Sequence, residues 1–170
     1  MSDINLVLIL LAGGTGTDTA QFFYDIHDFT IWKGTNITIS DKTLNRGGND
    51  QLSSIENITF NGTSFDVSNI RTGMFINSNV YKLLGDNGAA TLRRSRGDDG
   101  INDDTSSLWD VTAAKNNSSS FQVLLEGSGF RGGQYKVWNT DSSGIRSSDT
   151  GWLSGAQAVS AGYEENTFTK

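Results

Sequence analysis

The sequence predicts an all-β protein made of two small β-rich modules, whose short strands form β-roll-like or sandwich-like sheets. The chain contains 20 glycines and no proline, and it is rich in Ser, Thr, Asn and Asp. This composition is typical of short strands joined by tight turns. Apolar and polar side chains alternate in residues 37–40 (ITIS), as in a half-buried strand. We expect an N-terminal apolar strand and a glycine-rich turn in residues 1–20, a β module in residues 21–72 and a tryptophan-rich β module in residues 73–170.

Length and charge narrow the class of protein further. A chain of 170 residues can hold one domain or two small ones with a real core. Because cysteine is absent, the chain has no disulfides, no thiolate metal sites and no cysteine nucleophile. The formal net charge of −6 argues against a nucleic-acid partner, since phosphate binding needs a basic face. Acidity suits an extracellular protein or one that binds divalent cations.

The longest apolar run is INLVLILLA in residues 4–12. It is too short to cross a bilayer, which takes about 20 apolar residues. Asp3 is the only charge before it, so we expect no cleavable signal peptide and no membrane span. Exposed aliphatic side chains are costly, at about 1.5–3 kcal/mol each. We therefore interpret the run as an assembly arm, which joins its own sheet or a neighbour's. The residues assigned to this arm are Ile4, Leu6, Leu8 and Leu10.

The first module is predicted to hold four strands and an aromatic core. The strands are expected at residues 21–24, 28–33, 36–40 and 54–60, with turns between them that include residues 41–50. The aromatic side chains exceed what a catalytic pocket would need, so we assign them to the core. They are Phe22, Phe23, Tyr24, Phe29 and Trp32.

A catalytic centre is not expected. His27, the single histidine, lies between Asp25 and Asp28 in a predicted turn, and no nucleophile pairs with it by spacing. A solvated loop histidine is the favoured interpretation. A glycosidase pair such as Glu56 with Asp66 can be imagined, but strand positions do not place the two carboxylates at a working separation. We predict that the protein is not an enzyme.

An acidic loop follows three arginines at positions 93, 94 and 96. Its carboxylates and one amide surround a glycine, which suits a hard cation such as Ca²⁺. The spacing does not match an EF-hand loop, and the alternative is that the loop pairs with the arginines or is solvated. The candidate metal ligands here are Asp98, Asp99, Asn102, Asp103 and Asp104.

The segment from residue 134 to residue 144 reads as a strand and a turn. Tyr135 and Val137 fall on one face of the strand, and Lys136 and Trp138 fall on the other. A polar turn and the returning Trp152 complete a hairpin. Residues 156–162 are expected to form a short helix or loop. The tryptophans at 109, 138 and 152 form either a sugar-binding platform or a core. The candidate ligand-binding residues are Tyr135, Trp138 and Trp152.

Three motifs carry a resemblance to a known family. Residues 121–170, with YKVWNTDSSG, GWLSG and YEENTF, resemble the tryptophan-rich C-terminal domain of secreted bacterial RTX (hemolysin-type calcium-binding) proteins, especially cyanobacterial ones. The earlier run from LAGGTGTDTAQFFYDIHDFTIW to GGNDQLSSIENITFNGTSFDV resembles the module that follows RTX repeats. Within it, GGTGTDTA fits one calcium-binding nonapeptide, in which Asp18 would be a ligand. One copy does not complete such a site, and a plain glycine-rich turn is the alternative. The aspartate-rich tail expected after Phe168 is absent.

The resemblance implies secretion and folding with calcium rather than one activity. We therefore expect a non-enzymatic structural or adhesive module at a cell surface or in the extracellular space. Its role would be surface attachment or self-assembly, with copies of itself or other surface subunits as partners and possible stabilisation by Ca²⁺. One alternative is a virion decoration or tail protein at the virion surface. A second alternative is a glycan-binding module.

Overall fold

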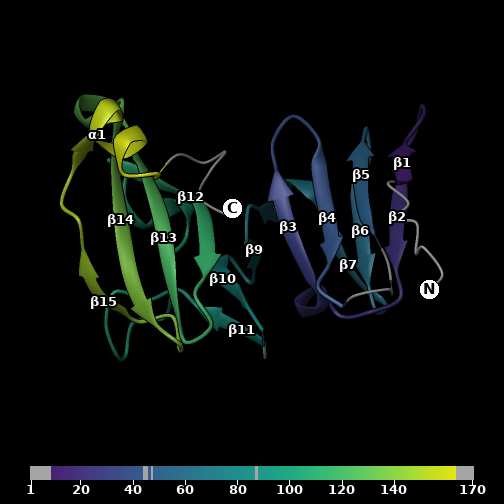
Figure 1. The fold of residues 1–170 in the computed structure, drawn as a ribbon, viewed down its shortest axis with the longest axis horizontal. Helices are drawn as coiled ribbons and strands as arrows, with labels where there is room; N and C mark the ends of the chain where they lie inside the picture. Colours follow the sequence, from purple (N-terminus) through teal and green to yellow (C-terminus); the bar gives the residue numbers. More distant parts are fainter. Residues whose placement is uncertain (1–8, 44–45, 47, 87, 164–170) are drawn as a thin grey trace, which may run out of the picture. The chain divides into compact units, whose positions relative to one another are not determined.

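The computed structural model describes residues 9–43, 46, 48–86 and 88–163, and it divides into two units, Met1–Ile70 and Arg71–Lys170 (Figure 1). Both units consist of small sheets of short strands, so the predicted all-β fold is confirmed. In the described part of the chain, no helix is long and apolar enough to cross a membrane.

Unit 1 contains two sheets. The first has the order β1-β5-β4-β3 and the second has the order β2-β6-β7. The strands of the first sheet are β1 (Ile9–Ala12), β5 (Asn49–Ser53), β4 (Ile37–Asp41) and β3 (Phe29–Lys33). Those of the second are β2 (Thr19–Phe22), β6 (Asn57–Phe60) and β7 (Thr63–Asp66). Two 3₁₀ turns complete the unit, η1 (Ile26–Asp28) and η2 (Val67–Asn69).

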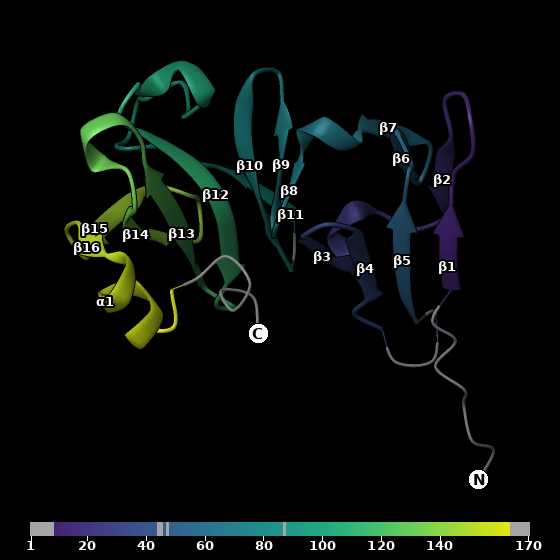
Figure 2. The same ribbon diagram turned by 90° about the horizontal axis from the view of Figure 1, so that it is seen from above.

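Two parallel pairings give unit 1 a roll-like construction. β1 runs parallel to β5 and β2 runs parallel to β6, so the chain passes from one sheet to the other twice along similar paths (Figure 2). The two connecting turns touch through their backbones. Gly13 N donates to Ser53 O at 3.0 Å, and Asn57 N donates to Asp18 O at 3.1 Å. A Cβ on Gly13 would lie 1.8 Å from Ser54 O, so glycine is required for this approach.

The predicted assembly arm is only partly described. Leu10 belongs to β1, which pairs with β5 of the same sheet. Ile4, Leu6 and Leu8 lie outside the described residues. β1 is one of the two outer strands of its sheet, the other being β3.

Phenylalanines form the core of unit 1. The rings of Phe22, Phe29 and Phe60 lie with centroids 5.2–5.3 Å apart, and all three residues are buried. The expectation that the whole aromatic run is core was wrong at two positions, because Phe23 and Tyr24 are 78% and 45% exposed. Side chains alternate along β2, so adjacent aromatic residues at its end cannot all face inward.

The sequence also missed β5. Residues 41–50 were expected to be a turn, yet Asn49–Ser53 lies between β1 and β4. The strand carries a single apolar side chain, Leu52, which is 2% exposed. Its place in the sheet comes from backbone pairing on both sides, which local hydrophobicity does not reveal.

Unit 2 contains a small sheet and a larger one. The small sheet has the order β11-β10-β9-β8. Its strands are β8 (Ile70–Arg71), which contains the unit boundary, β9 (Met74–Asn77), β10 (Val80–Gly85) and β11 (Gly88–Thr91). The larger sheet has the order β12-β13-β14-β15, with β16 also paired to β14. Its strands are β12 (Trp109–Asn116), β13 (Ser120–Gly127), β14 (Gln134–Asp141), β15 (Arg146–Asp149) and β16 (Leu153–Ser154).

Short helical turns accompany these strands. They are η3 (Asp103–Thr105), η4 (Gly129–Arg131) and the helix α1 (Gly155–Ser160), which packs against β14 (Figure 2). Residues 156–162 were expected to form a short helix or loop, and the structure has a helix there that begins at Gly155 and ends at Ser160. Ser154 caps it, because its hydroxyl accepts from Gln157 N while the Gln157 side chain accepts from Ser154 N.

The larger sheet of unit 2 buries both faces along its centre. Trp138 lies opposite Val123 and belongs to the core formed with Tyr81 and its neighbours in the small sheet. Val137 lies opposite Leu124 and packs on the other face with Tyr135. The predicted alternation along β14 is confirmed.

Candidate functional site

The strongest candidate site lies at one end of the larger sheet of unit 2, where β12 begins, β13 ends and β14 begins. A cavity of about 170 Å³ opens there, and we name it the aromatic pocket. Four of its lining residues are aromatic and two are cations. The pocket is lined by Leu108, Trp109, Leu125, Phe130, Arg131, Lys136, Trp138 and Trp152.

The aromatic residues of the pocket differ in exposure. Trp138 is only 3% exposed and forms the floor, with the Trp109 ring edge-on to it at a centroid distance of 5.3 Å. Phe130 on the rim is 73% exposed, and Leu108 is 39% exposed. The buried core of the unit thus continues outward into an accessible apolar surface, of the kind that holds the apolar face of a ligand.

Two cations lie against these rings. The Arg131 guanidinium is 5.1 Å from the Phe130 centroid and 5.4 Å from the Trp152 centroid. The Lys136 ammonium is 4.9 Å from the Trp152 centroid. Cation–π attraction at these distances holds both charges at the pocket. Lys136 also forms an ion pair with Asp149 at 3.8 Å, whereas no carboxylate in the described part of the chain pairs with Arg131.

The loop that carries Phe130 and Arg131 is fixed by its backbone. Ser128 N donates to Leu108 O at 2.9 Å, and Arg131 N donates to Ser128 O at 3.0 Å. A Cβ on Gly127 would lie 2.3 Å from Arg131 O, so the end of β13 packs directly on this turn. The Arg131 side chain donates to Gln134 Oε1 at 3.1 Å. The guanidinium is therefore positioned before any ligand arrives, which lowers the entropic cost of binding.

Trp152 is positioned by the segment that precedes it. Thr150 N donates to Val137 O, and Val137 N donates back to Thr150 Oγ1, both at 3.1 Å. Gly151 adopts a φ of +70°, and its N–H donates to Asp149 Oδ1 at 2.8 Å. This polar turn attaches the end of β15 to β14 and brings the indole over Lys136.

The structure separates the three predicted ligand-binding residues. Trp152 and Trp138 line the aromatic pocket, although Trp138 is core, while Tyr135 packs on the opposite face of β14. Phe130 and Arg131 were missed by the sequence interpretation. Their GFRGG context indicated only a loop, and the backbone bonds that bring the loop to Leu108 join residues far apart in sequence.

The predicted calcium loop has its oxygens engaged elsewhere. Asp98 accepts from Gly100 N, Arg94 N and Arg94 Nε. Burial alone would raise the pKa of the Asp98 carboxyl, but these hydrogen bonds outweigh it, so the pKa lies below its usual value. Asn102 caps η3 with Thr105, and Asp103 accepts from the buried Tyr81 hydroxyl.

The other predicted metal ligands, Asp99, Asp104 and Asp18, do not converge on a common point either. Asp99 and Asp104 are exposed. Asp18 accepts from Gly14 N at 2.8 Å, and its own N–H donates to Glu56 Oε2 at 2.8 Å, so it stabilises the contact between the two turns of unit 1. Among the described residues, no three acidic or histidine side chains converge on a point that could hold a metal ion.

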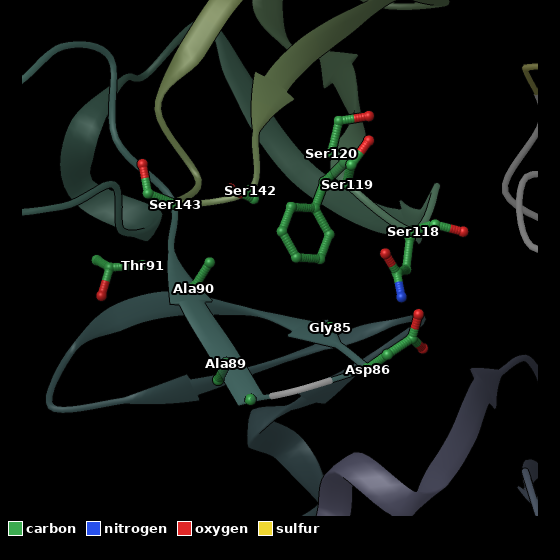
Figure 3. Close-up of a pocket in the computed structure, with 13 residues that line it drawn as sticks. Gly85, Asp86, Ala89, Ala90, Thr91, Ser118, Ser119, Ser120, Ser142 and Ser143 are labelled. Carbon is green, nitrogen blue, oxygen red and sulfur yellow. The ribbon is translucent and has the colours of Figure 1, made fainter.

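A second, larger cavity of about 390 Å³ lies at the opposite end of the sheet (Figure 3). Its wall of hydroxyls comes from the hairpin turn at Ser118–Ser120, with Ser142 and Ser143, and Asp86 faces it from the β10–β11 turn. Its aromatic residue, Phe121, is 4% exposed, and its single charge is a carboxylate. Its described lining lacks the exposed rings and cations that distinguish the aromatic pocket.

Comparison with family models, with curated proteins and with solved structures found no match. The resemblance to RTX proteins stays a prediction carried by the short motifs above.

Proposed function

We propose that this protein is a non-enzymatic extracellular attachment module, and that it adheres to surfaces by binding glycans in the aromatic pocket of unit 2. The observation that supports the proposal is the meeting of Trp109, Trp152, exposed Phe130 and two cations around one cavity. Aromatic rings take the apolar face of a pyranose, while a few fixed polar groups orient it.

The size of the pocket suits a weak, repeated contact. Its volume of about 170 Å³ is below the range of about 300–1,000 Å³ that encloses a drug-sized ligand. One sugar ring would therefore sit in it with part of its surface in water. Attachment to a cell surface, or to a virion surface in the alternative setting, would then come from many copies acting together.

Glycan-array binding of the full chain tests the proposal, with two exposed phenylalanines as a matched pair. Phe130→Ala and Trp152→Ala should abolish binding, whereas Phe23→Ala should leave it unchanged. Phe23 is 78% exposed in unit 1 and Phe130 is 73% exposed in unit 2, so both substitutions remove a similar surface ring. Trp138→Ala is unsuitable, because emptying this core position should cost about 3–5 kcal/mol. Absence of binding by the wild-type chain, or equal loss with Phe23→Ala, would refute the proposal.

Self-assembly is the second candidate function. β1 is an outer strand, and an exposed edge is a template for pairing with another chain. Light scattering over a range of concentrations should then show a mass that increases with concentration. A truncation of residues 1–8, which leaves β1 in place, tests whether the predicted arm drives this association. A monomeric mass at every concentration would exclude it.

Calcium stabilisation is part of the same proposal. The loop from Asp98 to Asp104 carries four carboxylates, of which Asp99, Asp103 and Asp104 are exposed, and Asp103 also accepts from Tyr81. Bound calcium would add about 2.7 kcal/mol at a hundredfold excess over the dissociation constant. Melting in calcium should therefore occur at a higher temperature than melting in a chelator, and the difference should disappear in Asp99→Asn/Asp104→Asn. Identical melting curves would remove calcium from the proposal.

A further inference from the structure

We propose that the aromatic pocket selects a carboxylated sugar of the uronic acid class over its neutral counterpart. This inference rests on the proposed glycan binding and adds the chemical class of the ligand. The rings would hold the sugar face, and Arg131 together with Lys136 would bind its carboxylate.

The charge of the pocket opposes that of the chain. The protein carries 19 acidic and 13 basic side chains, yet the charged residues among the described lining of this cavity are Arg131 and Lys136. Glu126, the nearest carboxylate along β13, pairs in register with Tyr135, on the face of the sheet away from Leu125 and the pocket. Two cations set among aromatic rings attract an anion more strongly than they would in water, because less solvent screens them.

Arg131 has the geometry for a carboxylate, and no carboxylate among the described residues pairs with it. The single hydrogen bond of its side chain among the described residues is to the neutral Gln134 amide. A guanidinium presents parallel N–H donors that match the two oxygens of a carboxylate. The surrounding turn already holds the side chain in place.

A third cavity, in unit 1, contains an arginine whose charge is satisfied by carboxylates of the protein. Arg46 lies 3.9 Å from the Tyr24 centroid beside a cavity of about 220 Å³. It donates to both oxygens of Asp41 at 2.9 and 3.0 Å and lies 3.4 Å from Asp28. With two carboxylates already bound, Arg46 has little to offer an anionic ligand.

Lys136 is held only loosely by its ion-pair partner, Asp149. Asp149 lies 3.8 Å from the Lys136 ammonium and also pairs with Arg146 at 3.4 Å. Such partly exposed ion pairs are weak. Lys136 can therefore turn to a ligand while Asp149 keeps its second partner, and Asp149 competes with the ligand carboxylate for this ammonium.

Titration calorimetry with an oligogalacturonide and its methyl ester tests the inference. The ester keeps the rings and removes the charge. We expect the free acid to bind at least about tenfold more tightly than the ester, with a preference that decreases in high salt. Arg131→Gln should weaken binding of the free acid about tenfold, and Arg131→Lys should weaken it less. Asp149→Asn, which removes the competitor and can still accept from Gly151 N, should strengthen binding about twofold to fivefold.

The controls distinguish selectivity for carboxylated sugars from glycan binding as such. Arg46→Gln should not change the affinity for either probe, and melting curves should show that Arg131→Gln stays folded. Equal affinity for acid and ester, or glycan-array binding confined to neutral sugars, would overturn the selectivity and leave glycan binding intact. No binding to any glycan would overturn both.

Discussion

The two units each place an arginine against an aromatic ring, and they use it differently. In unit 1, Arg46 stacks on Tyr24 and is bound by Asp41 and Asp28. In unit 2, Arg131 lies by Phe130 and Trp152, and among the described residues its guanidinium donates to the Gln134 amide alone. The contact between an arginine and an aromatic ring thus has a structural role in unit 1, where carboxylates of the protein satisfy the charge of the arginine. At Arg131, where no described carboxylate satisfies the charge, the guanidinium would be available to the anionic ligand proposed above.

The units also differ in how their strands are joined. Unit 1 stacks two sheet-to-sheet turns so closely that their backbones touch, and its strands have four or five residues. Unit 2 relies on eight-residue antiparallel strands whose side chains fill both faces. Unit 1 should therefore be most sensitive to changes at its turns, and unit 2 to changes in its core.

The largest effect is expected from Gly13→Ala. The new Cβ would lie 1.8 Å from Ser54 O, and neither backbone can move without breaking the bonds between β1 and β5. Overpacking of this kind should destabilise unit 1 by about 3 kcal/mol. Hydrogen exchange measured by mass spectrometry should show faster exchange in peptides of unit 1 and unchanged exchange in unit 2.

Gly14→Ala is the matched control for this prediction. A Cβ at the neighbouring position meets no atom within 4 Å, and Gly14 does not have a positive φ. Its exchange pattern should match that of the wild type. Equal effects of the two alanines would show that the contact between the turns does not hold unit 1 together.

Tyr81→Phe should have the next largest effect, and in unit 2. Tyr81 is 1% exposed, and its hydroxyl donates to Asp103 and, at 3.3 Å, to Asp110. Burial and the Asp103 hydrogen bond raise the pKa of Tyr81, so the hydroxyl stays protonated as a donor. Losing hydrogen bonds to charged acceptors should cost about 1.5–3 kcal/mol in urea unfolding.

A double-mutant cycle with Asp103→Asn isolates this bond. The coupling between the two substitutions should be at least about 1 kcal/mol. Independent, additive effects would mean that Tyr81 stabilises unit 2 through its ring alone. The acidic loop would then be attached to the core by other contacts.

The sequence predicted the parts of both units that depend on local pattern. The all-β class followed from glycine and polar turn residues, and the faces of β14 followed from alternation between Tyr135 and Trp138. Both are properties of neighbouring residues. The burial of Trp138 was left open, because alternation assigns a face without saying how deeply that face is covered.

The sequence could not predict what depends on distant backbone. β5 lacks a hydrophobic pattern and exists because β1 and β4 flank it. Likewise Arg131 enters the pocket because Ser128 bonds to Leu108, about twenty residues earlier in the chain. The calcium prediction was based on the number of carboxylates along the loop. Their orientation is set by distant or neighbouring partners, because Asp98 accepts from Arg94 and Asp103 accepts from Tyr81.

Comparing Arg46→Gln with Arg131→Gln tests directly whether the two arginines have different roles. Arg46→Gln should lower the stability of unit 1 and leave ligand affinity unchanged, because it unpairs Asp41 away from the pocket. In wild type, burial would raise the Asp41 pKa, and the Arg46 hydrogen bonds hold it below its usual value. Arg131→Gln should weaken ligand binding and leave the stability of unit 2 unchanged. Thermal melting and calorimetry on the same two variants measure both quantities. A loss of stability in both, or in neither, would remove the distinction between the two arginines.

The smallest expected effect is a pH dependence confined to unit 1, through His27, the single histidine of the chain. Burial lowers its pKa below 6.5 more than Asp25 and Asp28 raise it, and its Nδ1 has no hydrogen-bond partner among the described residues. The unfolded chain therefore takes up a proton first as the pH falls, so stability is present above pH 6.5 and declines below it. Hydrogen exchange in unit 1 should quicken as the pH is lowered from 6.5, after correction for the intrinsic exchange rate. Unit 2 should not change over this interval, and His27→Gln should make unit 1 equally insensitive.

An equal response in both units would assign the pH dependence to carboxylates, and the histidine would then be solvated, as the sequence predicted.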